Sequence, residues 1–154
     1  MQPKPSNASA VTMAVQMLPI DANPQGQVHG GTIMKLVDTA AAVAAHRHAR
    51  SMVVTARIDE MSFLAPVEVG DLVTLRASVN AVWNTSMEVG VRVETENLLT
   101  GEVRHTASAF LVLVAVDENR KPHAVPPLDP ATPEDQRRMS EAQARRMHRL
   151  TSRR

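Results

Sequence analysis

The stretch DANPQGQVHGGTIMKLVDTAAAVAAH, residues 21–46, decides the fold. It opens with loop-forming residues and continues, from Thr32 to about His46, as a helix that is apolar on almost every side. A helix of this kind is buried in a core and does not lie on a surface. One acid, Asp38, interrupts the apolar residues, although an aspartate is seldom buried without a partner. The stretch therefore predicts a central buried helix with one carboxylate that requires an explanation.

The chain on either side of this helix has the alternation of strands. Apolar and polar residues alternate most clearly over 86–97, where Met87, Val89, Val91 and Val93 share one face. The same pattern indicates strands over 11–17, 51–64, 72–83 and 103–118, with short connections between the later ones. Clean alternation with short connections is typical of an antiparallel sheet with one packed face and one wet face. The sequence predicts an α+β fold, an antiparallel sheet of about five strands wrapped around one long buried helix.

Composition divides the chain into three parts. Residues 1–9 are polar and contain two prolines, so we expect a flexible lead-in before the main domain at residues 10–128. Residues 129–154 form an arginine-rich helical tail, in which Thr132 caps a helix that begins with Pro133 and two acids. We expect its seven arginines to form a solvated face. The expected apolar seam of this helix consists of Met139, Ala142, Met147 and Leu150.

Global properties exclude several classes of protein. The 154 residues carry a formal net charge of +1, which gives no field for nucleic acid or an anionic membrane. There is no cysteine, which excludes disulfides, a thiolate nucleophile and a cysteine-based zinc site. No apolar run approaches the ~18 residues of a membrane span, and residues 1–10 lack a signal-peptide core. We therefore expect a cytoplasmic protein that binds neither nucleic acid nor membrane.

Two features of the helix carry candidate chemistry. Gly30 and Gly31 leave the first backbone N–H groups open at the positive end of the helix dipole, where a carbonyl oxygen can be polarised. The plainer alternative is that glycine only eases entry to a packed helix. Asp38 lies about two turns further on, at ~1.5 Å per residue, so a substrate lying along the helix meets both features. Its alternative is a boundary acid that faces a protein interface or pairs with an arginine such as Arg57 or Arg76.

The remaining polar residues of the stretch have ordinary explanations. Asn23 precedes a proline and, on spacing alone, is a turn former. His29 can act as an acid or a base, but no second histidine accompanies it at metal-ligand spacing. The chain also lacks the HExxH, GxSxG and phosphate-loop motifs. The sequence therefore predicts no metal site and no organic cofactor.

The segment NPQGQVHGGTIMKLVD, residues 23–38, resembles the hotdog-fold acyl-CoA thioesterases of the YciA and brain-type (BACH) acyl-CoA hydrolase group. The likeness continues in order through VVTARIDEMSFLAPVEVGDLV (53–73), TSMEVGVRVETENLLTGE (85–102) and PHAVPPL (122–128), and so covers roughly residues 10–128. It implies a hotdog fold, a long helix wrapped by an antiparallel sheet, which agrees with the pattern. The sequence departs from the group at Trp83-Asn84, where many relatives have glycine.

The resemblance implies hydrolysis of acyl-CoA to a free fatty acid and CoA. The helix acid of the group falls on Asp38, as a general base or a nucleophile. The upstream polar partner falls on Asn23, which orients the water or the carboxylate. The helix-start glycines fall on Gly30 and Gly31, and the Gly31 amide polarises the thioester carbonyl. Active sites of this group form between two subunits, so Asn23 and Asp38 are expected to meet across an interface.

The contacts to CoA are predicted from the resemblance and from charge. The ligand of the group runs along the strand that begins TSMEV, which makes Ser86 a candidate contact. Arg57 and Lys121 are our choices for the phosphates.

Two other functions fit a hotdog domain: a non-catalytic acyl-CoA sensor, and an enoyl-CoA hydratase or dehydratase, which needs a catalytic histidine beside an acid.

The predicted sheet also has a consequence for assembly. One sheet of five long strands covers one helix but leaves an edge and a flank exposed. Two copies side by side would join these edges and shield the paired helices. We therefore expect a homo-oligomer, at least a dimer and in full a trimer of dimers, with acyl-CoA as its substrate.

Overall fold

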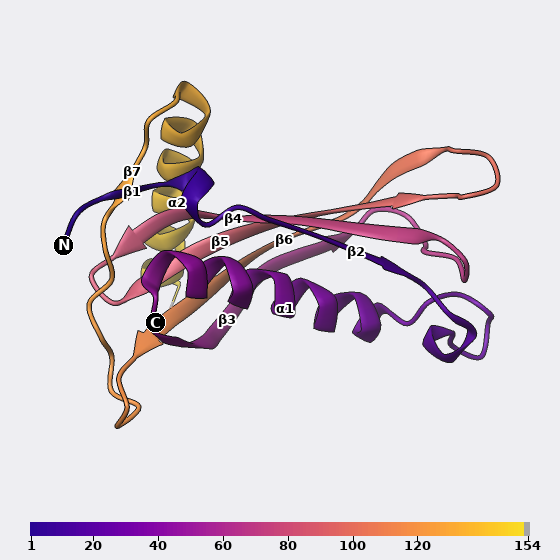
Figure 1. The fold of residues 1–154 in the computed structure, drawn as a ribbon, viewed down its shortest axis with the longest axis horizontal. Helices are drawn as coiled ribbons and strands as arrows, with labels where there is room; N and C mark the ends of the chain where they lie inside the picture. The colour runs from indigo at the N-terminus through magenta and orange to yellow at the C-terminus, as the bar shows by residue number, and fades with distance from the viewer. Residues whose placement is uncertain (153–154) are drawn as a thin grey trace.

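The main sheet is antiparallel throughout, as the sequence predicts (Figure 1). The computed structural model describes residues 1–152. The strand order is β2-β4-β5-β6-β3. The bounds are Val11–Gln16 for β2, Met52–Phe63 for β3, Leu72–Trp83 for β4, Ser86–Glu96 for β5 and Val103–Val116 for β6. Strands β2 and β3 therefore form the two edges, and β4, β5 and β6, which carry most of the buried strand residues, lie between them.

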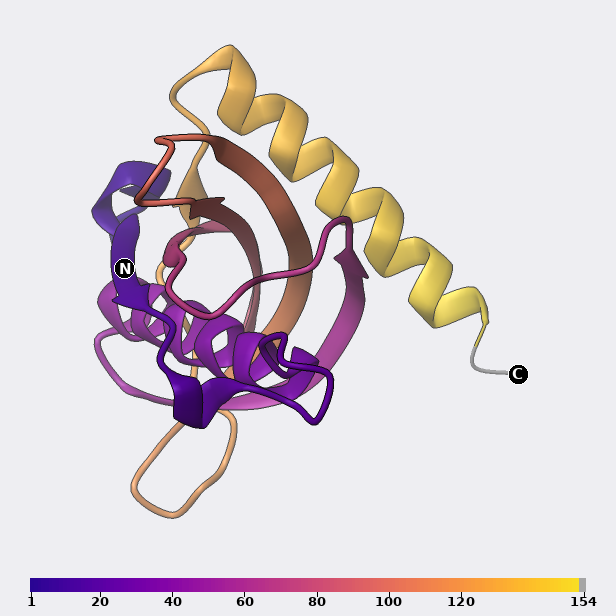
Figure 2. The ribbon, with the colours of Figure 1, turned by 90° about the vertical axis from the view of Figure 1, so that its right-hand side faces the viewer.

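Helix α1, Gly30–Ala49, lies in the concave side of this sheet (Figure 2). Its buried apolar residues recur at helical spacing and belong to one core cluster with the inward side chains of the strands: Ile33, Val37, Ala40, Ala41, Ala44 and Ala45. The helix is longer than the expected 32–46, and it ends where Arg50 turns into the left-handed conformation with a φ of 52°. The opposite side of α1 stays open, with Met34 40% exposed, because no other described element covers it. Burial on almost every side, as predicted, is therefore wrong for a single chain.

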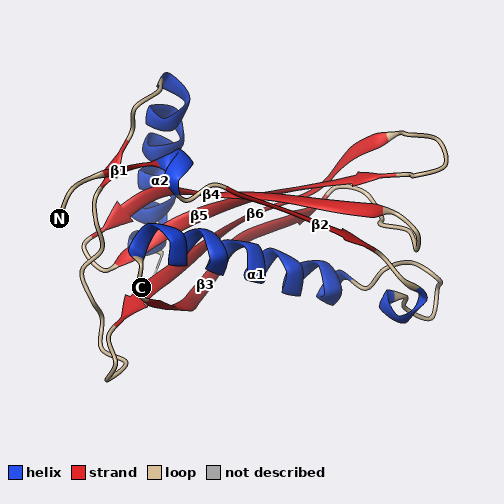
Figure 3. Ribbon diagram, viewed as in Figure 1, coloured by secondary structure: helices blue, strands red, loops and turns tan. Residues whose placement is uncertain are grey.

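Helix α2, Pro133–Thr151, lies on the other face of the sheet from α1 (Figures 2 and 3). The predicted cap is confirmed: the Asp135 N–H donates to Thr132 Oγ1 at 3.1 Å, and the Thr132 N–H donates back to the Asp135 carboxylate at 3.3 Å. The second sheet face is therefore not simply wet, because α2 covers part of it. Neither helix of residues 1–152 is long and apolar enough to cross a membrane.

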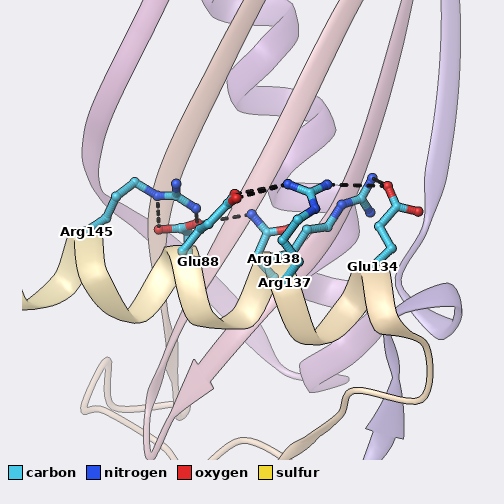
Figure 4. Close-up of polar contacts among 7 residues, drawn as sticks. Glu88, Glu134, Arg137, Arg138 and Arg145 are labelled. Carbon is cyan, nitrogen blue, oxygen red and sulfur yellow. Dashed lines mark hydrogen bonds and ion pairs between the residues drawn. The ribbon is translucent and has the colours of Figure 1, made fainter.

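The arginines of α2 correct the expectation of a solvated face (Figure 4). Arg145 donates from Nη2 and Nε to the carboxylate of Glu88, at 2.6 and 3.1 Å, and Glu88 is fully buried. The Arg145 guanidinium also lies 3.6 Å from the ring centroid of Phe110. Arg137 and Arg138 behave as predicted and form exposed ion pairs with acids of α2 itself. Arg153 and Arg154 lie outside the described residues.

The apolar seam of α2 is shorter than predicted. Ala142 is fully buried and Met139 packs against the core, but Met147 and Leu150 are 53% and 51% exposed. The place expected for them is taken by Arg149, whose side chain is only 10% exposed. The helix thus binds the sheet through charged contacts as much as through apolar ones.

Part of the expected lead-in, residues 4–9, contacts the rest of the chain, and its flexibility stays a prediction. Strand β1, Lys4–Pro5, pairs in parallel with β7, Leu128–Asp129, and is followed by a 3-10 turn at Ser6–Ala8. Ser9 is fully buried, and its hydroxyl accepts the N–H of Val79 at 3.0 Å. A second 3-10 turn, Pro19–Asp21, leads into the loop before α1. The division of the chain near residue 129 stays a prediction.

His48, in the last turn of α1, makes the stability of the fold depend on pH. It is fully buried, and its Nε2 lies 2.7 Å from the carbonyl oxygen of Pro126, which can only accept. Burial lowers the pKa of His48 below its ordinary 6.5, and the nearby Lys4 lowers it further against the opposing effect of the Pro126 contact. Below about pH 6.5, His48 is therefore protonated in the unfolded chain but not in the folded chain. The free energy of unfolding consequently decreases as the pH is lowered.

We expect urea midpoints to fall more steeply between pH 7 and pH 5 for the wild type than for His48→Gln, which has no titrating group at this place. The exposed His123 supplies the matched control, because His123→Gln should keep the wild-type slope. Equal slopes for all three proteins would show that His48 does not titrate differently on folding.

Candidate active site

The carboxylate of Asp38 has a partner that the sequence did not indicate. The hydroxyl of Thr55 on β3 donates to Asp38 Oδ1 at 2.7 Å. Asp38 is half-buried, and it forms no ion pair within residues 1–152. The arginines considered as its partners are engaged elsewhere: Arg57 pairs with Asp59 at 3.1 Å, and Arg76 pairs with Glu94 at 2.8 Å. One oxygen of Asp38 therefore accepts a hydrogen bond from Thr55, and Oδ2 has no hydrogen-bond partner among residues 1–152.

The glycines at the start of α1 present open amides. No acceptor within the described chain takes the N–H of Gly31, and a Cβ built on it would meet nothing within 4 Å. A Cβ on Gly30 would stand in ordinary contact with Phe63, at 3.6 Å. Packing therefore does not demand glycine at position 31. The free space instead leaves the amide accessible at the positive end of the helix, where it can donate to a carbonyl oxygen.

Asn23 shapes the loop before the helix. Its Oδ1 accepts the N–H groups of Gln25 and Gln27, at 3.0 and 3.1 Å, which is the turn-forming role expected from spacing alone. That arrangement uses only the oxygen, so the amide Nδ2 remains available as a donor. His29, next to the glycines, is exposed and makes no side-chain cap.

A single chain holds these groups as two separate halves. Asn23 and the Gly31 amide lie at the beginning of α1, whereas Asp38 and Thr55 lie about two turns further along, roughly 10 Å by the rise of a helix. No hydrogen bond joins Asn23 to Asp38 among the described residues. A thioester carbonyl must lie about 3 Å from each group that acts on it. One carbonyl therefore cannot contact both the Gly31 amide and the Asp38 carboxylate of one chain.

The three candidate CoA contacts lie near the same end of the sheet. Ser86, the first residue of β5, is paired with Val114 of β6. Val114 is paired on its other side with Val54 of β3, the residue before Thr55. Its hydroxyl has only a long contact, 3.4 Å, to the carbonyl oxygen of Trp83. Lys121 is exposed on the turn after β6, and the side chain of Arg57 is 44% exposed.

Two hollows lie away from Asp38. An apolar hollow of about 350 Å³ sits beside the start of α1, lined by Val28, Gly30, Ile33, Phe63, Leu64, Ala65, Pro66 and Val67. A larger one of about 430 Å³ lies under α2 on the outer sheet face, next to Arg76, Arg92 and Arg145. Within residues 1–152 no group of three or more His, Asp or Glu side chains could hold a metal ion.

A family model and several known proteins match this chain in sequence. The family model described as Thioesterase superfamily matches residues 25–102. Protein VdlD of Helicobacter pylori is 37% identical over 141 residues, 92% of this chain and 80% of the relative. The acyl-CoA thioester hydrolase YkhA of Bacillus subtilis, described as uncharacterized, is 40% identical over 127 residues, 82% of this chain and 74% of the relative.

Solved structures agree with these relatives. An apo-hexameric acyl-CoA thioesterase superposes with a TM-score of 0.94 at 42% identity, over 98% of this chain and 97% of that one. An acyl-CoA hydrolase of Staphylococcus aureus, solved with butyryl coenzyme A and coenzyme A, gives 0.89 at 31% identity, over 97% and 92% of the two chains. The chain therefore belongs to the thioesterase superfamily, and its fold is the hotdog fold that the sequence predicted.

Proposed function

We propose that the protein hydrolyses acyl-CoA thioesters to a free fatty acid and CoA. The observation that carries this proposal is the carboxylate of Asp38, oriented through one oxygen by Thr55 and free at the other, on a helix whose first amides are open. As a general base, Asp38 would take a proton from water while the water oxygen attacks the thioester carbonyl carbon. The carbon–sulfur bond then breaks, and the CoA thiolate takes up the proton. As a nucleophile, Oδ2 would attack the carbon itself and form an anhydride, while the carbon–sulfur bond breaks and the CoA thiolate leaves. Water would then hydrolyse the anhydride to the free acid and the Asp38 carboxylate, and the proton released would go to the thiolate.

A related enzyme supports the choice of residues. The Staphylococcus aureus hydrolase was also solved as three variants in which an asparagine, an aspartate or a threonine is replaced by alanine. Those three positions are separated by 15 and 17 residues, the same intervals that separate Asn23, Asp38 and Thr55 here. We infer that Asn23 and Thr55 serve the reaction together with Asp38, and that the Gly31 amide polarises the carbonyl.

A thiol-release assay across short, medium and long acyl-CoAs tests the function. We expect one free thiol for each acyl group released, with no loss of rate when EDTA is added. A sensor of acyl-CoA would bind these compounds and release no thiol. A hydratase would change the absorbance of an enoyl-CoA and also release none, so either outcome would overturn the proposal.

The two half-sites predict an oligomer. Edge strand β3 exposes Met52, Val54 and Ile58 at 50%, 39% and 37%, and the open flank of α1 adds Met34. A second copy running in the opposite direction would cover these residues and bring Asn23 and Gly31 of one chain to Asp38 of the other. The related hexameric thioesterases support a trimer of dimers. We expect light scattering at micromolar concentration to give at least the dimer mass, and a monomer mass would remove the shared site. A cytoplasmic location remains our prediction.

Arg57 and Lys121 are proposed to hold the CoA phosphates, with Ser86 beside them. A phosphate contact of this kind is equal in the ground state and the transition state, so its loss raises KM and spares kcat. We expect Arg57→Ala and Lys121→Ala to raise KM several-fold. The control is Arg104→Ala, because Arg104 pairs with Glu102 near the opposite end of the sheet. If Arg146→Ala raises KM and neither proposed variant does, the cations are on α2 instead.

A further inference from the structure

Strand β3 is irregular next to Thr55. It is an edge strand that pairs only with β6 among the described elements. Its register shifts twice within six residues, between Thr55 and Arg57 and again between Ile58 and Glu60, so that Ala56 and Asp59 have no partner on β6. Such bulges bend a strand, increase its twist and change where its side chains point. The direction of Thr55, which directly precedes the first bulge, therefore depends on how the bulged segment is held.

The second bulge is held from outside by helix α2. Arg149 Nη1 donates to Asp59 Oδ2 at 2.7 Å, and Arg57 Nε lies 3.1 Å from Asp59 Oδ1. The side chains of Arg149 and Asp59 are only 10% and 9% exposed. The Arg149 guanidinium also lies 5.8 Å from the ring centroid of Trp83, at the end of β4. The pair thus joins the last turns of α2 to β3, through contacts that water screens little.

We propose that Arg149 and Asp59 are a positioning pair for the hydrolysis, an inference that rests on the proposed function. The pair fixes the bulged segment of β3 on the outer side of the sheet. The fixed segment keeps the Thr55 hydroxyl on Asp38 Oδ1 on the inner side, 2.7 Å away. Neither residue touches the substrate in this account. Both act through Thr55, which in turn orients the carboxylate.

The proposal predicts where the kinetic effect falls. A misplacement of about 1 Å in a catalytic group can cost about 100-fold in rate. Because the pair does not touch the substrate, its loss should change substrate binding little. We expect Arg149→Ala to lower kcat roughly 10-fold or more, with KM changed less than about 2-fold. Arg149→Lys keeps a cation within reach of Asp59 and should recover part of the rate. Asp59→Asn should act like Arg149→Ala.

The decisive experiment repeats Arg149→Ala in a Thr55→Val background. Valine keeps the shape of threonine and removes the hydroxyl, so nothing is left for the pair to align. We expect Arg149→Ala to lower kcat in the wild type and to leave it unchanged in Thr55→Val, which is strong coupling between two residues on opposite faces of the sheet. Arg137→Ala, in an exposed ion pair of the same helix, should leave both backgrounds unchanged.

Three outcomes separate the possibilities. An equal fall in kcat in both backgrounds would show that the pair does not act through Thr55, and would overturn the proposal. A rise in KM with kcat unchanged would assign the pair to substrate binding and overturn it as well. Absence of thiol release by the wild type would instead overturn the proposed function. If Arg149→Ala does not fold, Arg149→Lys and Asp59→Asn enter the same comparison.

Discussion

Asp38→Asn is expected to lower kcat by at least about 100-fold, and by up to about 10,000-fold, while the protein stays folded. General base catalysis by a positioned side chain contributes roughly that range, and an amide can neither accept the proton nor attack the thioester. Asparagine has the size of aspartate and can still accept the Thr55 hydroxyl through its oxygen. Because Asp38 is half-buried and has no ion pair among residues 1–152, loss of its charge should leave the melting temperature unchanged or raise it.

The matched control is the next residue of the same helix. Thr39 is exposed, and its hydroxyl only donates to the carbonyl oxygen of Lys35 one turn back. Thr39→Ala should therefore keep wild-type kcat. Thiol release and thermal unfolding of the three proteins decide the matter. If Asp38→Asn unfolds while Thr39→Ala does not, Asp38 is a structural residue and the assignment of the active site is wrong.

Half of the candidate site was visible in the sequence because it breaks a pattern. A carboxylate in an apolar helix is costly unless something uses it, and two adjacent glycines at a helix start leave amides free. These conflicts with local preference marked Asp38 and Gly31. Thr55 gave no such signal, because threonine is an ordinary strand residue and fits the alternation of residues 51–64. Only the packing of β3 beside α1 brings Thr55 to Asp38.

The prediction that the outer face of the sheet is wet is wrong for a similar reason. Glu88 alternates with apolar neighbours along its strand, so by pattern it belongs to a wet face. Arg145 lies in a helix whose many arginines have the composition of a solvated surface. Either residue alone is ordinary. Burial arises only from the pair, together with Asn80, whose Nδ2 donates to Glu88 at 3.0 Å. Contacts over 57 positions of sequence separation leave no local signal.

Arg145→Ala is expected to destabilise the fold by about 3 kcal/mol, because it leaves the buried carboxylate of Glu88 without its charged partner. Removal of one partner from a buried ion pair costs roughly 3–5 kcal/mol. The 20% exposure of the Arg145 side chain, which admits some water, favours the lower end of that range. For a domain of this length, about 3 kcal/mol corresponds to a fall of roughly 6–12 °C in Tm, measured at one fixed protein concentration.

Two further variants show whether the stranded charge is the cause. Arg137→Ala removes an exposed pair with Glu141 on the same helix, and such pairs contribute about 0.3–0.5 kcal/mol, so its Tm should stay close to wild type. The double variant Glu88→Met and Arg145→Met removes both charges and fills the space with apolar atoms, so it should lose less stability than Arg145→Ala alone. Equal or greater loss in the double variant would mean that α2 is held by the packing of Arg145 on Phe110, which lies 3.6 Å away, and not by the ion pair. If the ion pair holds α2, Arg145→Ala should lose more stability than the double variant, because only the single variant leaves a buried charge without its counter-charge.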